Sequence, residues 1–195
     1  MSTLTLIGDV HGKVNEYWKL VTHQVKGKSV QVGDFGFKES HEWHRLNIDG
    51  RQHKVLFGNH DYYPMLYAAH SLGDWHFEDG ICYIRGAYSI DKAYRLANNW
   101  PWFAEEELDY EQGSALVEQF AMWKPRVVVS HDCPRSVSQA LFSIEDKSMT
   151  TNILQACLEA HQPELWVFGH HHKSKSEELD GVRFRCLAEL ELMEL

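Results

Sequence analysis

Residues 3–12 read TLTLIGDVHG, an apolar run with β-branched side chains that ends in a cluster of glycine, aspartate and histidine. The same order recurs as SVQVGDFGF at 29–37, HKVLFGNHD at 53–61, RVVVSHDCP at 126–134 and LWVFGHHH at 165–172. Apolar runs without polar alternation are typical of strands that are buried on both faces. The pattern therefore predicts a fold built on buried strands, each followed by side chains that can bind metal.

Segments with the spacing of amphipathic helices separate these strands, and such an alternation is typical of an α/β domain. With 195 residues and 44% hydrophobic content, the chain fits a single domain over residues 1–195. Asp180-Gly181 predicts a hairpin turn before the last strand, after which we expect a solvated acidic tail. The predicted helices cover 14–25, 113–123 and 150–162, and further strands are predicted over 81–90 and 181–192.

The formal net charge of -9 does not favour duplex nucleic acid as a partner, because an acidic surface repels the phosphate backbone. Cys82, Cys133, Cys157 and Cys186 are far apart and form no CxxC pair, which indicates reduced thiols. The sequence has no signal-like N-terminal segment and no run near the roughly 20 apolar residues of a membrane-spanning helix. We therefore expect a cytoplasmic protein without membrane association, and no feature of the sequence indicates an oligomeric state.

Polar clusters at the carboxyl ends of strands lie where α/β proteins bind their ligands. In Asp9-x-His11, residues two apart on an extended chain point the same way and could reach one ion. His170-x-His172 has the same spacing, which turns His171 the other way. A ligand set of Asp, Asn and His without thiolate suits Mn, Fe, Zn or Ni better than a structural zinc site. The candidate ligands outnumber the needs of one four-coordinate ion, so we expect two divalent cations that share a carboxylate. These candidates are Asp9, His11, Asp34, Asn59, His131, His170 and His172.

The order of these motifs along residues 8–172 resembles the calcineurin-like metallophosphoesterase superfamily. The motifs are Asp9-x-His11, Gly33-Asp34, GNHD at 58–61, His131 and Gly169-His170-x-His172. The resemblance implies an α/β fold of two packed mixed β-sheets flanked by helices, an αββα sandwich. It also implies two metal ions, with manganese favoured over Fe, Zn or Ni. Carried over by position, one metal is held by Asp9, His11, Asp34 and His172, and the other by Asp34, Asn59, His131 and His170.

Such a pair of cations about 3.5–4 Å apart lowers the pKa of a bridging water, and the resulting hydroxide attacks phosphorus. The departing oxygen then needs a proton, for which His60 is the candidate general acid. Asp61 follows it in the chain and could orient the imidazole. Asn59 and His60 are also expected to contact the substrate. A non-catalytic relative would show degenerate ligands, and none is degenerate here.

The sequence favours a phosphodiester over a phosphomonoester. Ser/Thr protein phosphatases of the superfamily usually carry Asp-Arg-Gly after the second motif, whereas this chain reads GDFGFKES at 33–40 without arginine. Its SHDCP at 130–134 is more similar to the phosphodiesterase and small-phosphatase branches. An arginine can act as a fork that pairs with a phosphate through two parallel hydrogen bonds. A dianionic monoester needs such a fork to neutralise its second charge, and a monoanionic diester needs it less. We therefore expect a small cyclic or short nucleotide diester as substrate, with a protein or nucleotide phosphomonoesterase as the alternative.

An arginine from elsewhere could replace that fork. IRGAYSIDKAYR at 84–95 supplies Arg85 and Arg95 as candidate contacts for the substrate phosphate. The alternative is that these side chains form structural ion pairs, for example with Asp91.

Two further features have open interpretations. Trp100, Trp102 and Phe103 could wall a pocket that stacks a nucleobase, or could pack beneath a loop. Asp132 could accept a hydrogen bond from the neighbouring His131, because ligating imidazoles usually donate to an outer acceptor.

Overall fold

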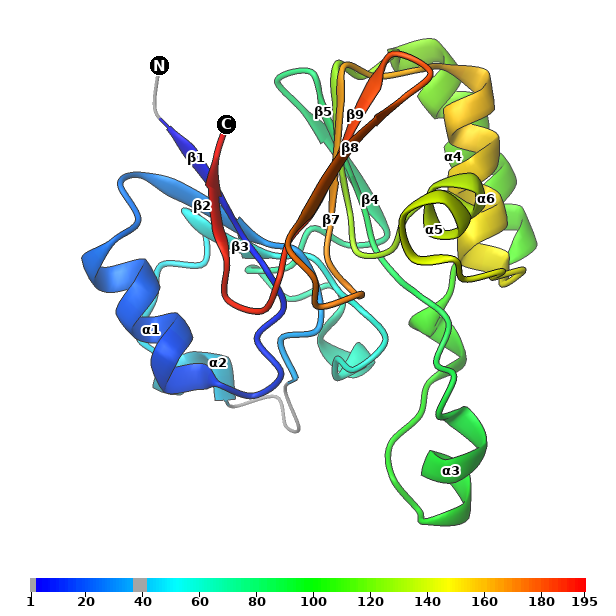
Figure 1. Ribbon diagram of the computed structural model, residues 1–195. Helices are drawn as coiled ribbons and strands as arrows, with labels where there is room; N and C mark the ends of the chain where they lie inside the picture. The colour runs from blue at the N-terminus through cyan, green and yellow to red at the C-terminus, as the bar shows by residue number, and fades with distance from the viewer. Residues whose placement is uncertain (1–2, 37–41) are drawn as a thin grey trace.

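Two β-sheets pack against each other in the computed structural model (Figure 1), which describes residues 3–36 and 42–195. The first sheet consists of β1 (Leu4–Ile7), β2 (Lys28–Gln31), β3 (His53–Val55) and β10 (Leu192–Glu194), in the order β10-β1-β2-β3. β1, β2 and β3 are parallel, and β10 is antiparallel to β1. The carboxyl ends of these three parallel strands therefore lie at the same edge of the sheet.

The second sheet consists of β4 (Trp75–Glu78), β5 (Ile81–Ile84), β6 (Val127–Ser130), β7 (Leu165–Phe168), β8 (Lys175–Leu179) and β9 (Val182–Cys186). Its order is β4-β5-β6-β7-β9-β8, with β5, β6, β7 and β9 parallel and the two edge strands antiparallel to their neighbours. β6 and β7 are buried at every position, as their continuous apolar sequences predict.

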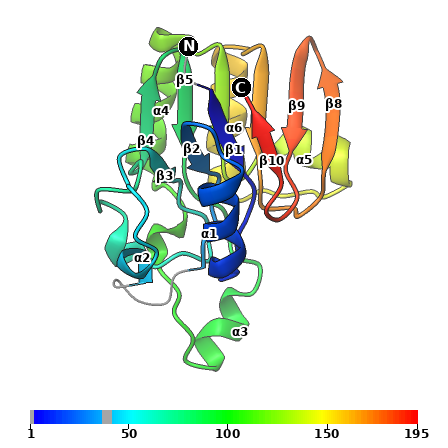
Figure 2. The same cartoon turned by 90° about the vertical axis from the view of Figure 1, so that its left-hand side faces the viewer.

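Helices cover the outer face of each sheet. α1 (Val14–His23) and α2 (Glu42–Arg45) lie over the first sheet and are in front of it in Figure 2. α4 (Tyr110–Trp123), α5 (Arg135–Phe142) and α6 (Met149–Ala160) lie over the second sheet. The predicted fold class, two mixed sheets flanked by helices, is therefore confirmed.

Three apolar cores hold these layers together. Between the sheets, Leu6 and Val30 of the first pack with Val129 and Val167 of the second. Outside the first sheet, the core includes residues of α1 and α2, and outside the second it includes residues of α4, α5 and α6. Both sheets are thus fixed from two sides, which makes the loops at their ends a rigid support for a site.

The chain between β5 and α4 leaves the second sheet and projects beyond the strand ends, where it forms α3 (Lys92–Ala97) and the 3₁₀ turn η2 (Ala104–Glu106) (Figure 1). A second 3₁₀ turn, η1 (Tyr63–Met65), follows β3. These segments lie on the side where the polar clusters leave the strands. Within the described residues, no helix is both long and apolar enough to span a membrane.

The predicted helices correspond to α1, α4 and α6, and the predicted strands are present with shorter bounds. The expected hairpin turn is confirmed: Asp180 and Gly181 have φ of 51° and 82° and connect the paired residues Leu179 and Val182. A positive φ at both turn residues is the geometry that Asp-Gly favours in a tight hairpin.

The strand predicted over 181–192 and the solvated tail after it need correction. β9 ends at Cys186, and the chain then crosses to the first sheet, where Leu192–Glu194 pairs with β1 as β10. The backbone N–H of Leu195 donates to the carbonyl of Leu4 at 2.9 Å. The end of the chain therefore covers the edge of β1, which would otherwise present unpaired backbone groups.

Candidate metal centre

The polar clusters after β1, β2, β3, β6 and β7 converge on one place. The parallel strands of each sheet end on the same side, so the loops that follow them are neighbours. Several of the candidate ligands have a strained backbone there, with positive φ outside glycine. These are His11 at 47°, Asp34 at 56°, His170 at 61° and His172 at 54°. Left-handed non-glycine residues cost about 1–3 kcal/mol each and cluster at functional sites.

The first group of ligands combines Asp9, His11, Asp34 and His172, whose ligand atoms all lie within 4.8 Å of one another. Nε2 of His172 lies 3.3 Å from Oδ2 of Asp9 and 2.7 Å from Nε2 of His11. Nε2 of His11 lies 3.8 Å from Oδ2 of Asp34. Two imidazole nitrogens and two carboxylates thus face a common point.

The second group combines Asp34, His131 and His170 within the same 4.8 Å limit. Nε2 of His131 lies 3.3 Å from Oδ1 of Asp34 and 3.3 Å from Oδ1 of Asn59. Asp34 therefore belongs to both groups, with a different oxygen directed to each. The chemistry of these donors fits two adjacent divalent cations, since oxygen and imidazole ligands without thiolate suit Mn, Fe, Zn or Ni.

Burial and charge set the ionisation of these ligands. Burial raises the pKa of Asp34, but the charge of His131 and its hydrogen bond outweigh burial and lower it. Burial lowers the pKa of His131, yet the Asp34 carboxylate overrides it and raises the pKa to about 10. Burial also raises the pKa of Asp9, but the hydrogen bonds to His11 and His172 together with the charge of His131 lower it below its ordinary value. Both carboxylates are therefore held in the charged form that binds cations.

An outer hydrogen bond can orient one of the ligands, and a carboxylate lies farther from another. Nδ1 of His131 lies 3.0 Å from the carbonyl oxygen of Val32, to which it can donate, so that Nε2 faces Asp34. Nδ1 of His172 lies 4.0 Å from Oε1 of Glu189, which also pairs with Lys13. Glu189 was not anticipated from the sequence, where it lies in an acidic segment that looks like a solvated end.

Two glycines of the predicted motifs lie so close to ligand carboxylates that no side chain fits at their positions. A Cβ at Gly58 would lie 2.3 Å from Oδ1 of Asp34, and a Cβ at Gly169 would lie 2.1 Å from Oδ1 of Asp9. Any side chain at either position would displace a carboxylate of the first group. This explains why glycine precedes the ligands at these two strand ends.

His60 lies beside the two groups. Its backbone N–H donates to Oδ1 of Asp34 at 2.8 Å, and its ring centre is 5.8 Å from that of His11. Burial lowers the pKa of the imidazole, although Asp34 and Asp91 oppose that shift. The half-buried ring is therefore close to the ligands without belonging to either group.

Asp61 has a different position from the one expected for a partner of His60. Oδ1 accepts the backbone N–H of Gly36 at 2.8 Å, and Oδ2 accepts that of Gly58 at 2.8 Å. Burial raises the pKa of this carboxyl to about 7. Among the described residues, no hydrogen bond joins Asp61 to the imidazole of His60. The geometry thus favours a role in holding the loops after β2 and β3 together.

Arg85 is 1% exposed, and its guanidinium is directed to Asp74 and the backbone of Glu105. Its Nε donates to Oδ1 of Asp74 at 2.7 Å, Nη1 donates to the carbonyl of Glu105, and the guanidinium lies 5.2 Å from the ring centre of Tyr63. This geometry favours the structural ion pair over a substrate contact, with Asp74 as partner in place of Asp91.

Arg95 is also buried and saturated by protein acceptors. Nη2 donates to Oε1 of Glu106 at 2.8 Å, Nη1 donates to the carbonyl of Asn59 at 3.0 Å, and Nε donates to the carbonyl of Pro101 at 2.8 Å. Oγ of Ser89 accepts from Nη1 of Arg95 at 2.8 Å. The guanidinium of Arg95 therefore stabilises the loop that carries Asn59. This favours the structural role of Arg95 over a contact with the substrate phosphate.

The same network sets the side chain of Asn59. Its Nδ2 donates to Oγ of Ser89 at 3.1 Å, and that hydroxyl donates to Oε2 of Glu106 at 2.6 Å. The amide oxygen of Asn59 is thereby left to face His131. Ser89 and Glu106 were missed by sequence reasoning, because a serine in a loop and one glutamate in a run of three carry no local signal.

Asp132 and His171 form a third group next to the second. Nε2 of His171 lies 3.4 Å from Oδ1 of Asp132, so this carboxylate contacts His171 and not His131 as the sequence interpretation offered. The His171 ring stacks on Phe142 with ring centres 4.1 Å apart. Burial raises the pKa of the Cys133 thiol well above its ordinary value, which leaves the thiol unreactive. His171 is thus turned away from the two ligand groups, as predicted. The extended chain assumed for that prediction is wrong, because His170 and His172 both have positive φ and belong to different groups.

A cavity of about 710 Å³ opens beside the ligands and is bordered by His11 and His60. Trp100 and Phe103 also line it, so at least part of the aromatic segment forms a pocket wall. Trp102 is not among the lining residues and instead carries Nζ of Lys92 over its ring, 3.7 Å from the centre.

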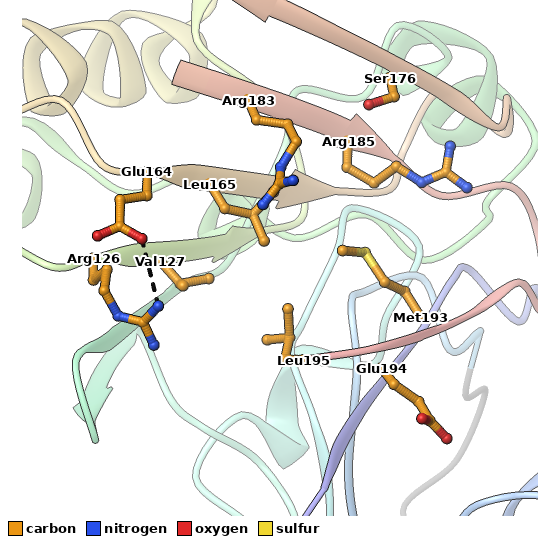
Figure 3. A pocket seen from close by; sticks show the side chains of 10 residues that line it. All are labelled: Arg126, Val127, Glu164, Leu165, Ser176, Arg183, Arg185, Met193, Glu194 and Leu195. Atoms are coloured by element: carbon orange, nitrogen blue, oxygen red, sulfur yellow. Dashed lines mark hydrogen bonds and ion pairs between the residues drawn. The ribbon is translucent and has the colours of Figure 1, made fainter. Parts of the chain in front are cut away.

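A second hollow lies at the opposite end of the strands (Figure 3). It is bordered by Val127 and Leu165, the first residues of β6 and β7, and by three arginines. The arginine Arg126 is paired with Glu164 at 3.5 Å, and Arg185 is paired with Glu191. Ligands of α/β proteins bind at the carboxyl ends of strands, so this hollow is not the candidate site.

The fold and the shared-carboxylate geometry define a metal-binding phosphoesterase class of protein. The calcineurin-like phosphoesterase family model matches residues 2–174, and the chain belongs to this family. No curated protein matches the chain.

Solved structures resemble the chain at low sequence identity. TT1561 of Thermus thermophilus has a TM-score of 0.56 at 12% identity, with 99% of this chain and 97% of that chain covered. Phosphopantetheinyl hydrolase from Mycobacterium tuberculosis has a TM-score of 0.52 at 16% identity, with 96% and 89% covered. A putative 5'-nucleotidase from Staphylococcus aureus has a TM-score of 0.57 at 14% identity, with 98% and 50% covered. At these identities the likeness concerns the fold alone.

Proposed function

We propose that the chain is a dinuclear metal-dependent phosphodiesterase that cleaves small, nucleotide-like diesters. The observation that carries the proposal is the membership of Asp34 in both ligand groups. A carboxylate shared in this way holds two cations close together, as phosphoester hydrolysis by a metal pair requires. In this proposal, one cation is bound by Asp9, His11, Asp34 and His172, and the other by Asp34, Asn59, His131 and His170. Manganese is the favoured metal.

Bound cations supply Lewis acidity for the phosphoryl group and a nucleophilic water. The residues of the chain supply the remaining functions. His60 protonates the departing oxygen, since its ring borders the cavity and the first ligand group. Asn59 binds metal and contacts the phosphate from the second group. Asp61 acts indirectly, by fixing the loop that carries His60.

The positions of the arginines support a diester over a monoester. Both Arg85 and Arg95 direct their guanidinium groups to protein acceptors, so neither offers a fork to a dianionic phosphate. A monoanionic diester places less charge at the metal pair and needs no such fork. The buried free cysteines fit the reducing cytoplasm that we propose as its location.

A phosphomonoesterase is the second candidate, and Lys13 is the observation that favours it. Lys13 pairs with Glu189, which lies 4.0 Å from Nδ1 of His172. The ammonium group is half-exposed at the rim of the first ligand group and could turn to neutralise a second phosphate charge.

The test compares kcat/KM of manganese-loaded protein for bis(p-nitrophenyl) phosphate and p-nitrophenyl phosphate. A preference for the diester supports the proposed function. A preference for the monoester that is lost in Lys13→Met would support the second candidate instead. Hydrolysis of neither ester by protein with two bound metals would overturn both. The Asp34→Asn variant, which lacks the carboxylate common to both ligand groups, measures any contaminating activity.

A further inference from the structure

The cavity beside the ligands has aromatic walls. His11 and His60 border it on the side of the metal ligands, and Tyr62, Trp100 and Phe103 line it farther out. Tyr62 and Phe103 brace each other with ring centres 5.8 Å apart. Tyr94 contacts the indole of Trp100 edge-on at 5.5 Å, and Trp100 keeps 57% of its surface exposed. The rings of the wall therefore contact one another, and Trp100 has aromatic surface available to a ligand.

The charged groups that border this cavity favour a ligand that donates hydrogen bonds. Asp91 lines the cavity, and no hydrogen bond to its carboxylate comes from any residue of 3–36 or 42–195. Its nearest cation is Arg95, with Nη1 3.8 Å from Oδ1 of Asp91. Because Arg95 is saturated by Asn59, Pro101 and Glu106, it offers no donor to the cavity. Among the described residues that line the cavity, a further phosphate would thus meet an acceptor and no available Lys or Arg side chain.

The position of His60 decides which part of the substrate enters the cavity. The group that protonates the departing oxygen must lie on the side of the leaving alcohol. His60 borders the cavity, so the leaving alcohol extends past its ring toward Trp100. This step rests on the proposed function, in which His60 is the general acid.

We infer that the leaving group is a nucleoside, with its planar base stacked on Trp100 and an N–H edge of the base facing Asp91. Stacking of a base on an aromatic side chain is favourable for every base, because each has a π-face. A cavity of about 710 Å³ is in the range of small-molecule sites and exceeds the needs of a small ammonium alcohol. An alkyl or lipid alcohol would cover Oδ1 of Asp91 without donating a hydrogen bond to it.

Equilibrium binding of free nucleosides tests this site without any catalytic step. Adenosine, guanosine and cytidine are titrated into manganese-loaded protein by calorimetry, with ribose and choline as comparison ligands. We expect the nucleosides to bind and ribose to bind at least about tenfold more weakly, given the usual strength of base stacking. Tighter binding of choline than of any nucleoside would overturn the inference in favour of a cationic alcohol.

The variants Trp100→Ala and Trp102→Ala form a matched pair. Loss of stacking at Trp100 should weaken nucleoside binding about 5- to 150-fold, whereas Trp102→Ala should bind as the unaltered chain does. Asp91→Asn should weaken binding of bases with N–H donors and leave circular dichroism unchanged. Equal losses in the two tryptophan variants would overturn the stacking role.

The outcomes separate this inference from the proposed function. Hydrolysis of bis(p-nitrophenyl) phosphate without nucleoside binding would overturn the inference and leave the phosphodiesterase intact. Nucleoside binding that depends on Trp100, in a metal-loaded protein that cleaves no ester, would support the nucleoside site and overturn the catalytic proposal.

Discussion

The backbone N–H of His60 donates to Oδ1 of Asp34 at 2.8 Å, so the carboxylate shared by both ligand groups also positions the candidate general acid. Since the imidazole and the carboxylate lie on loops after different strands, this contact fixes the loop after β3 against the loop after β2. Metal binding and leaving-group protonation are therefore linked through one side chain, and the two roles need separate tests.

Replacement of Asp34 tests the shared carboxylate. Asp34→Asn removes the charge that faces both ligand groups, so we expect both metals to bind more weakly by at least about 10- to 100-fold, the loss seen even for outer partners of ligands. Elemental analysis after dialysis gives the metal content. Asp9→Asn is the control, because Asp9 belongs to the first group alone. Full occupancy of both sites in Asp34→Asn would contradict the bridge.

Replacement of His60 tests the proton donor. His60→Ala keeps every side chain of the two ligand groups, so the metal content should not change. Hydrolysis of diesters with alkyl leaving groups should slow by about 10²- to 10⁴-fold, and that of p-nitrophenyl diesters much less, because p-nitrophenolate departs without a proton. A plot of log kcat against leaving-group pKa measures the difference. Parallel plots for the two proteins would argue against general acid catalysis.

Much of this site could be predicted from the sequence because buried parallel strands have a distinct composition. RVVVSHDCP and LWVFGHHH have no polar alternation, and both contain strands that are buried throughout. Asp, Asn and His at the ends of such strands have little structural reason to be there. Ligand candidates could therefore be named from type and position, and the structure brings Asp9, His11, Asp34, His131, His170 and His172 into two adjoining groups.

The parts that escaped prediction depend on contacts between distant residues. β8 has the sequence KSEEL and exposed side chains at an edge, so its composition resembles a loop. β10 is a strand only because it pairs with β1, at the other end of the chain. For Arg85 and Arg95 the sequence left both a substrate contact and a structural ion pair open, since nothing in their spacing reveals Asp74 or Glu106 as partners.

Glu106 is expected to control stability and the second metal together. It is 2% exposed, pairs with buried Arg95 and accepts the hydroxyl of Ser89, which holds Asn59. Glu106→Gln removes the carboxylate that contacts the buried guanidinium of Arg95 and leaves only the partly exposed Asp91, 3.8 Å away. The free energy of unfolding should therefore fall by about 3–5 kcal/mol. Urea denaturation measures this change.

The same variant should reduce metal content at the second group more than at the first, because Asn59 loses its orientation. Glu105→Gln is the matched control, since Glu105 is exposed in the same turn. An unchanged unfolding midpoint in Glu106→Gln would show that the buried network contributes little.

Metal binding should stabilise the fold strongly. His11 and His172 place their Nε2 atoms 2.7 Å apart beside two buried carboxylates, and both residues have positive φ, so the ligands are held in a costly arrangement that a cation would offset. At a free manganese concentration 100 times the dissociation constant, we expect about 2.7 kcal/mol of added stability for one site. Thermal unfolding in chelator and in graded manganese measures this as a rising midpoint. Asp34→Asn should shift the response to higher manganese, because the ion then meets an amide in place of a carboxylate. If the thermal unfolding midpoint of the unaltered chain did not change with manganese concentration, a preformed metal centre would be contradicted.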